Sequence, residues 1–145
     1  MSTRPKILFV CTGNTCRSAM AEALWRQMGY DAESAGVSAW PGLPAAGHAR
    51  EVVKRYQASL EDHRARDLAD VQGPYDLVLT MTRDQRRRVA DLKPEWADRA
   101  FVLSEWVGES GDVVDPVGHD FDAYQAVAEE IHHLLQKLKE KLTDS

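Results

Sequence analysis

The stretch ILFVCTGNTCRSAMAEALW, residues 7–25, decides the fold. Its first four residues, Ile7 to Val10, form a continuous apolar run rich in β-forming side chains, which predicts a strand buried on both faces of a parallel sheet. A polar, glycine-containing segment follows. Ser18 to Trp25 then has the apolar spacing of a helix, with Gly29 as its stop signal. A strand, a loop and a helix in this order form the first unit of an α/β fold.

The rest of the chain repeats this alternation. Three further strands are expected over residues 31–35, 75–81 and 100–103, and three further helices over residues 45–56, 84–92 and from Phe121 onward. Strands separated by helices indicate right-handed crossovers between parallel strands. We therefore predict a single-domain, Rossmann-like α/β fold over residues 1–145, with a four-stranded parallel sheet and helices on both faces.

Length and composition fit one ordinary globular domain. The chain has 145 residues, of which 43% are hydrophobic and 28% charged, and its formal net charge is -5. This acidic balance provides no field that would attract nucleic acid, and the basic runs 86–88 and 137–141 fit solvated helix faces. No apolar run is long enough for a signal-peptide core or a membrane span. We expect a cytoplasmic protein without nucleic-acid or membrane partners.

The two cysteines stand five positions apart, as Cys11 and Cys16. Such a pair is not the disulfide framework of a small secreted domain. It is also a poor zinc site, because no second Cys/His pair stands at ligand spacing. In a reducing cytoplasm both thiols would be available for chemistry.

The loop from Cys11 to Ser18 follows the first strand, at the sheet edge where ligands bind in α/β folds. Gly13 permits unusual backbone angles, so that successive N–H groups can converge on one oxyanion beside a positive helix N-terminus. Arg17 can offer two parallel N–H bonds to phosphoryl oxygens. These surroundings favour the thiolate of Cys11, which is the nucleophilic form. The loop predicts attack on phosphorus by Cys11, whereas a buried cysteine beside a surface arginine is the alternative interpretation.

A phosphatase of this kind also needs a proton donor for the leaving group and a base for water. Asp115, in the loop before the last helix, is the best candidate because Pro116 restricts its backbone. Asp-Pro also marks plain loop turns, and spacing alone does not distinguish the two roles.

Five motifs occur in order along nearly the whole chain, namely Val10–Ser18, Ser34–Gly36, His63–Arg66, the strand 76–81 and Asp115–Pro116. Together they resemble the low-molecular-weight protein tyrosine phosphatase family. The resemblance implies Cys11 as nucleophile, Arg17 as phosphate clamp and Asp115 as general acid and then base, with no metal or other cofactor. It also implies phosphorylated proteins as substrates and inorganic phosphate as product; we expect a monomer.

The resemblance also assigns supporting residues. Asn14, Ser18, Ser34 and His63 would form a hydrogen-bond network that holds the loop and its thiolate. The phosphate-binding loop itself would comprise Thr12, Gly13, Asn14, Thr15, Cys16 and Ser18. Cys16 resembles the family's vicinal cysteine, which could form a disulfide with Cys11 and so shield it from irreversible oxidation; a small filler residue is the alternative. The other four histidines match no motif and are expected at the surface: His48, His119, His132 and His133.

Three positions bear on the substrate. Tyrosine-directed members usually carry an aliphatic residue where this chain has Thr15, and aromatic residues where it has Val117. Trp40 matches the family's aromatic wall. Thr15, the Met81-Thr82 pair and the Asp-Pro-x-Gly ending all resemble the bacterial protein-arginine phosphatase branch, although Val117 lacks the ring expected in either branch. We therefore expect phosphoarginine as the substrate, with phosphotyrosine as the alternative.

Two other function classes are less well supported. An arsenate reductase on this fold would need further cysteines, and the chain has only two. A non-catalytic phosphate-binding module would not need Cys11, Arg17 and Asp115 together.

Overall fold

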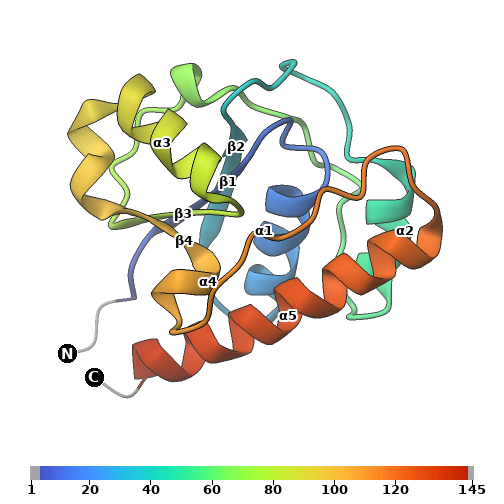
Figure 1. Ribbon diagram of the computed structural model, residues 1–145. Coiled ribbons are helices and arrows are strands. Elements are labelled where there is room, and N and C mark those ends of the chain that lie inside the picture. Colours follow the sequence, from blue (N-terminus) through green and yellow to red (C-terminus); the bar gives the residue numbers. More distant parts are fainter. Residues whose placement is uncertain (1–3, 144–145) are drawn as a thin grey trace.

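Four parallel strands form one sheet in the computed structural model, which describes residues 4–143. The strand order across the sheet is β2-β1-β3-β4 (Figure 1). The strands are β1 (Ile7–Cys11), β2 (Ala32–Gly36), β3 (Leu77–Thr80) and β4 (Ala100–Val102). This confirms the predicted α/β class with a four-stranded parallel sheet. Residues 1–3 and 144–145 of the predicted domain lie outside the described part.

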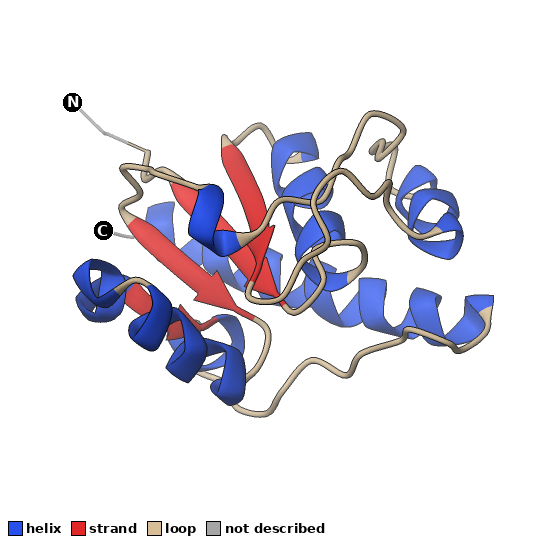
Figure 2. Ribbon diagram, turned by 90° about the horizontal axis from the view of Figure 1, so that it is seen from above, coloured by secondary structure: helices blue, strands red, loops and turns tan. Residues whose placement is uncertain are grey.

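Helices cover both faces of the sheet (Figure 2). They are α1 (Arg17–Gln27), α2 (Gly47–Lys54), α3 (Arg83–Leu92), α4 (Leu103–Trp106) and α5 (Phe121–Thr143), with two 3-10 turns, η1 (Leu68–Asp70) and η2 (Pro94–Arg99). The long helix α5 packs along α1 and α2 on one face, and α3 packs with η2 on the other. Between residues 4 and 143 no helix is both long and apolar enough to cross a membrane.

The first strand explains why the sheet has two covered faces. Ile7 and Phe9 belong to the core beneath α1, α2 and α5, while Leu8 and Val10 belong to the core beneath α3. Successive side chains of a strand point to opposite faces, so an unbroken apolar run requires cover on both. All four side chains are fully buried. The prediction from this run is confirmed.

Several element boundaries differ from those predicted. The strand predicted over residues 75–81 is limited to Leu77–Thr80. Beyond Thr80, the Met81 N–H is shared between Val10 O of β1 at 3.1 Å and Gln85 Oε1 of α3 at 3.0 Å, and the Thr82 N–H donates to Gln85. The strand predicted over residues 100–103 ends one residue early, since Leu103 begins the short helix α4, which was not predicted.

Candidate active site

The loop of residues 11–17 connects the end of β1 to the start of α1 at the carboxyl edge of the sheet. Three of its carbonyl oxygens accept hydrogen bonds from the chain that follows β2: Val37 N to Cys11 O at 3.0 Å, Ser38 N to Thr12 O at 3.0 Å and Ala46 N to Thr15 O at 3.0 Å. Within the described residues, the N–H groups of residues 13–16 donate to no protein acceptor. The loop is thus held through its carbonyls, and its N–H groups remain available for an oxyanion.

The nucleophile candidate Cys11 lies at the buried floor of this loop, with 2% of its surface exposed. Its Sγ lies 2.9 Å from Ser18 Oγ. Ser18 Oγ accepts a hydrogen bond from Asn14 Nδ2 at 2.9 Å, so its one proton can point either at the sulfur or at Ala35 O, which lies farther away at 3.4 Å. A hydroxyl in this position stabilises a thiolate more than a thiol.

Asn14 is the centre of the predicted network. Its backbone is left-handed, with φ of 59°, a conformation that asparagine tolerates better than most residues. Its Nδ2 donates to Ser34 Oγ and Ser18 Oγ, both at 2.9 Å, and its Oδ1 accepts from Arg66 N at 2.9 Å. His63 Nε2 donates to the Asn14 carbonyl at 2.7 Å. The four residues predicted to form this network therefore do so, and His63 acts on the loop backbone, away from the sulfur.

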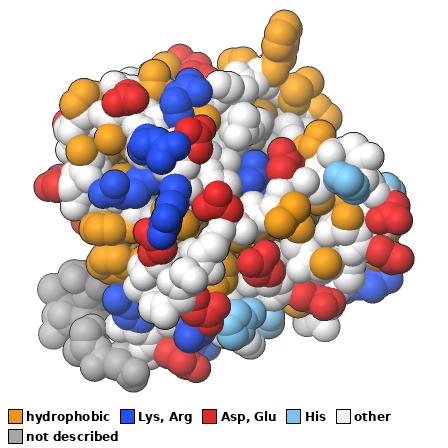
Figure 3. All heavy atoms as spheres, viewed as in Figure 1, with side chains coloured by type: hydrophobic (Ala, Val, Ile, Leu, Met, Phe, Trp, Pro, Cys, Tyr) orange, Lys and Arg blue, Asp and Glu red, His pale blue; other side chains and the backbone are white. Residues whose placement is uncertain are grey.

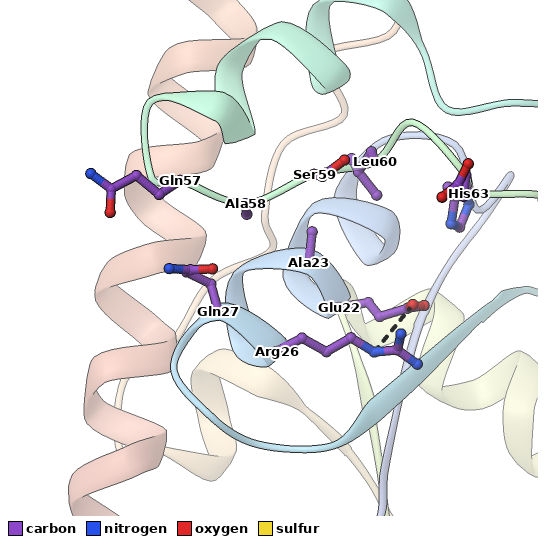
Figure 4. A pocket seen from close by; sticks show the side chains of 10 residues that line it. Glu22, Ala23, Arg26, Gln27, Gln57, Ala58, Ser59, Leu60 and His63 are labelled. Atoms are coloured by element: carbon purple, nitrogen blue, oxygen red, sulfur yellow. Dashed lines mark ion pairs between the residues drawn. The ribbon is translucent and has the colours of Figure 1, made fainter.

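The network continues to the surface through Glu22, which sequence reasoning did not single out. Ser34 Oγ donates to Glu22 Oε1 at 2.6 Å, and Glu22 also pairs with Arg26 at 3.6 Å. Glu22 and His63 both line a hollow of about 430 Å³ between α1 and residues 57–63 (Figure 4). The thiol of Cys11 is not part of its lining. This hollow is therefore the outer end of the supporting network and lies apart from the nucleophile.

Arg17 and Asp115 meet beside the loop. The Arg17 side chain is buried, and its Nη1 donates to Val113 O at 2.9 Å while its Nη2 lies 3.5 Å from Asp115 Oδ2. Asp115 is about half exposed, and its Oδ1 accepts a hydrogen bond from Val117 N at 3.0 Å. The structure thus places Asp115 beside Arg17 of the loop that begins at Cys11, although Asp115 lies far along the chain.

Gly36 allows the loop to approach the end of β2. A methyl group built on this glycine would overlap the Thr12 carbonyl oxygen and would lie 3.0 Å from Ala39 Cβ. The obstruction by Thr12 is backbone, which cannot rotate away as a flexible side chain could. This close contact gives a physical reason for glycine in the Ser34–Gly36 motif.

Gln85 is a second residue that sequence reasoning missed. Its Nε2 donates to Thr12 Oγ1 at 3.1 Å, while its Oε1 accepts from the N–H groups of Met81 and Thr82. Thr82 and Gln85 also form a capping box at the start of α3. Thr-x-x-Gln after a strand is a recognisable capping signal, so the helix start could have been found. The contact with Thr12 depends on the tertiary fold.

Cys16 is the second buried thiol of the loop. Its Sγ lies 3.5 Å from the Tyr124 hydroxyl of α5, and both cysteines are free thiols. Burial raises the pKa of Cys16, and the charges of Cys11 and Asp115 raise it further, against the hydrogen bonds from Tyr124 and Thr15. Cys16 therefore remains protonated near neutral pH. The contact with Tyr124 was not predicted.

Two of the predicted specificity residues, Trp40 and Val117, which we call the rim, are more exposed than Thr15. Trp40 is 76% exposed and Val117 is 57% exposed, whereas Thr15 is half-buried within the loop. Figure 3 shows that hydrophobic side chains reach the surface on this view of the molecule. The rim therefore offers apolar surface to a substrate without enclosing it.

The remaining histidines divide into two groups. His119 and His133 are exposed, as predicted. His48 and His132 also reach the surface, but each is partly covered by an aromatic ring. His48 packs edge-on against Tyr124 at 5.3 Å between ring centroids, and His132 lies 4.7 Å from the ring of Tyr56. Burial lowers the pKa of His132, so this ring is neutral in its packed position.

Comparison with known proteins agrees with this geometry. Residues 6–145 match the family described as "Low molecular weight phosphotyrosine protein phosphatase". The protein-arginine-phosphatase of Bacillus subtilis (strain 168) is 37% identical over 143 residues, which cover 94% of this chain and 95% of the relative. The structure of the low molecular weight protein tyrosine phosphatase from T. tengcongensis is 44% identical with a TM-score of 0.88, and the match covers 95% of this chain and 99% of that one.

A third relative is a cysteine-to-serine mutant of the YwlE arginine phosphatase, solved with a phosphorylated active-site serine. It is 38% identical, with a TM-score of 0.89 and coverage of 95% of both chains. Sequence motifs, fold and relatives agree over nearly the whole length. The chain belongs to the low molecular weight phosphotyrosine protein phosphatase family.

Proposed function

We propose that this protein phosphatase removes phosphate from phosphoarginine residues of proteins through a phosphocysteine intermediate on Cys11. The observation that carries the substrate choice is Thr15, which is half-buried in the loop between Cys11 and Arg17. The similarity to the protein-arginine-phosphatase of Bacillus subtilis supports it. Phosphotyrosine is the alternative substrate, because the family also contains tyrosine phosphatases of similar identity.

In the first step, the Cys11 thiolate attacks phosphorus in line with the departing guanidino nitrogen. An S–P bond forms, the N–P bond breaks, and Asp115 donates a proton to the leaving nitrogen. Arg17 and the free N–H groups of residues 13–16 stabilise the charge on the three phosphoryl oxygens. A guanidino nitrogen leaves poorly as an anion, so the proton from Asp115 is essential at this step.

In the second step, water attacks the phosphocysteine. Asp115, now a carboxylate, accepts a proton from that water, and inorganic phosphate leaves as the S–P bond breaks. Cys11 departs as a thiolate, and the Ser18 hydroxyl 2.9 Å away stabilises it. The relative with a phosphorylated active-site serine supports a covalent intermediate at this position, because serine replaces cysteine there.

Thr15 is the residue that we assign to substrate choice. A phosphoarginine substrate places a planar, polar guanidino group next to the loop. Threonine offers a hydroxyl and less bulk there, whereas isoleucine would place apolar surface against a group that needs hydrogen bonds. Trp40 and Val117 would then contact the rest of the substrate at the exposed rim.

The free Cys11–Cys16 pair supports a redox function for Cys16. On oxidation by a peroxide, Cys11 would become a sulfenic acid, and the Cys16 thiol would displace water to form a reversible disulfide. Both cysteines are buried and neither is in a disulfide. Such chemistry fits a monomeric protein in a reducing cytoplasm, with no nucleic-acid or membrane partner.

The deciding experiment compares two peptides of the same sequence, one with phosphoarginine and one with phosphotyrosine. Wild type should prefer phosphoarginine in kcat/KM, and Thr15→Ile should shift the preference toward phosphotyrosine. Thr15→Val is the matched control, because it removes the hydroxyl and nearly keeps the shape. Preference for phosphotyrosine in wild type, unchanged in Thr15→Ile, would contradict the proposal.

A further inference from the structure

A hollow of about 300 Å³ lies along the loop that carries Asp115. One wall is the loop itself, from Val114 to Pro116. His119, in the loop before α5, also lines the hollow, and the other wall is a face of α5 with Ala123, Ala126, Val127 and Glu130. These four positions are spaced as neighbours on one side of a helix. Because Asp115 is part of the lining, the hollow begins at the catalytic acid and extends away from it.

Most of this lining is apolar, and its polar side chains are Asp115, His119 and Glu130. Val114 is 68% exposed, so the apolar wall is open to a partner. Glu130, although much of its side chain is exposed, makes no hydrogen bond or ion pair with the described residues. Burial and the nearby charge of Glu109 both raise the pKa of Glu130, against the opposing influence of His133. A carboxylate in these surroundings is stabilised by an added cation.

Apart from His119, whose side chain makes no hydrogen bond or ion pair with the described residues, the groups near this face that can carry positive charge are already bound. Arg17 holds Val113 O and Asp115, while Lys137 and His133 both contact Glu109, at 2.8 and 2.7 Å. Figure 3 shows that Lys and Arg side chains gather over α3, whereas the α5 side carries mainly acidic ones. The hollow therefore combines an apolar wall with an unpaired negative charge.

We propose that this hollow binds a lysine or arginine side chain of the substrate protein, close in sequence to the phosphorylated residue. The aliphatic stem would cover Ala126 and Val127, and the charged head would reach Glu130. From Ala123 to Glu130 the helix rises about 10 Å, and an extended peptide advances about 3.3 Å per residue. A basic residue one to three positions from the phosphorylated residue can therefore reach Glu130. This inference rests on the proposed phosphatase function and specifies its preferred substrates.

The test uses phosphoarginine peptides that differ only at the three positions on each side of the phosphorylated residue, where lysine, leucine, alanine or glutamate is placed. Rates are normalised to hydrolysis of a small aryl phosphate by the same protein, which removes effects of folding. Wild type should prefer the lysine series over the glutamate series in kcat/KM by about three- to tenfold at low salt, with less discrimination at high salt.

Glu130→Gln should reduce this preference to less than about twofold, the range expected once a surface ion pair is removed. Glu129→Gln is the matched control, since Glu129 directly precedes Glu130, is exposed and does not line the hollow. It should keep the wild-type preference. Equal rates for the lysine and glutamate series would overturn the inference. It would also be overturned if the leucine series were hydrolysed fastest and Glu130→Gln did not change this order.

Failure of the proposed function would look different. If wild type hydrolyses only phosphotyrosine peptides, the phosphoarginine assignment is wrong, and the same four flanking series on phosphotyrosine then test the hollow independently. If wild type does not hydrolyse the aryl phosphate, the catalytic assignment itself is wrong.

Discussion

The floor of the phosphate loop and its rim differ in how completely their polar groups are bonded. Asn14 uses both side-chain polar atoms and its carbonyl, and Ser18, Ser34 and His63 all contact it. The rim residues Trp40 and Val117 are largely exposed. Groups that are held before the substrate arrives need not reorganise during the reaction, which is the basis of electrostatic preorganisation. The floor is therefore suited to chemistry and the rim to choosing among substrates.

The largest effect is expected at the floor, from Cys11→Ser. A serine hydroxyl stays protonated where a thiolate would form, so turnover should fall below detection in steady-state assays. Thermal unfolding should change little, because the substitution is nearly isosteric. Cys16→Ser is the matched control and should retain turnover. Wild-type rates in Cys11→Ser would show that the nucleophile lies elsewhere.

The next effect is expected where floor and rim meet, from Asp115→Asn. An amide cannot donate the proton that the leaving nitrogen needs, so kcat should fall by about 10²–10⁴-fold. Inhibition by inorganic phosphate should persist, since Arg17 and the loop N–H groups remain. Asp120→Asn, in the same acidic segment, should behave like wild type. A loss of phosphate inhibition equal to the loss of kcat would instead assign Asp115 to binding.

Gln85→Ala tests whether the contact from α3 to Thr12 helps to hold the phosphate loop. The substitution removes the contact with Thr12 Oγ1 and leaves the Thr82 N–H without its acceptor, whereas the Met81 N–H keeps Val10 O as an acceptor. A lost buried partner costs about 1–3 kcal/mol, so the free energy of unfolding should drop by that amount.

The same variant should also reduce kcat/KM, because Thr12 is in the phosphate loop. Gln85→Glu separates the two effects, since it keeps an acceptor for the backbone but loses the donor to Thr12. Gln125→Ala, at a partly buried position of α5 that does not contact Thr12, is the control. A wild-type kcat/KM in Gln85→Glu would show that the hydrogen bond from Gln85 to Thr12 does not contribute to catalysis.

The smallest effect is expected at Glu33, on the far side of β2 from the thiol. Burial disfavours its charge, but hydrogen bonds from Tyr75, Arg66 and Lys6 outweigh this and lower the pKa of Glu33 to about 2. A carboxyl whose folded pKa lies below its unfolded value of 4.5 contributes stability above pH 4.5, and that stability is lost as the pH falls toward 2.

In Glu33→Gln, Tm should therefore fall less steeply as the pH is lowered over this range. The difference in the free energy of unfolding should be less than about 1 kcal/mol, because the ion pairs of Glu33 are partly exposed. Glu140→Gln, an exposed substitution on α5, should leave the decline unchanged. Catalysis at neutral pH should be normal in both. An unchanged acid profile in Glu33→Gln would show that these contacts contribute nothing.

Much of the fold was predictable because hydrophobic periodicity is a local property. The apolar run from Ile7 to Val10 and the regularly spaced apolar residues of α5 each indicate which faces of the element are buried. Both patterns can be recognised without reference to the rest of the chain. Boundaries were less predictable, since contacts from elsewhere end the elements. Just after the third strand, for example, the Thr82 N–H donates to Gln85 of the next helix.

For the site, the sequence alone determined the chemical groups: a cysteine and an arginine in one loop, and an aspartate before proline. These follow from residue type and short spacing, which the chain displays directly. Only the tertiary structure decided which distant groups support them. Glu22 reaches Asn14 through Ser34, Gln85 reaches Thr12, and Tyr124 reaches Cys16. Such contacts join residues up to 108 positions apart, and their geometry depends on how helices pack around the sheet.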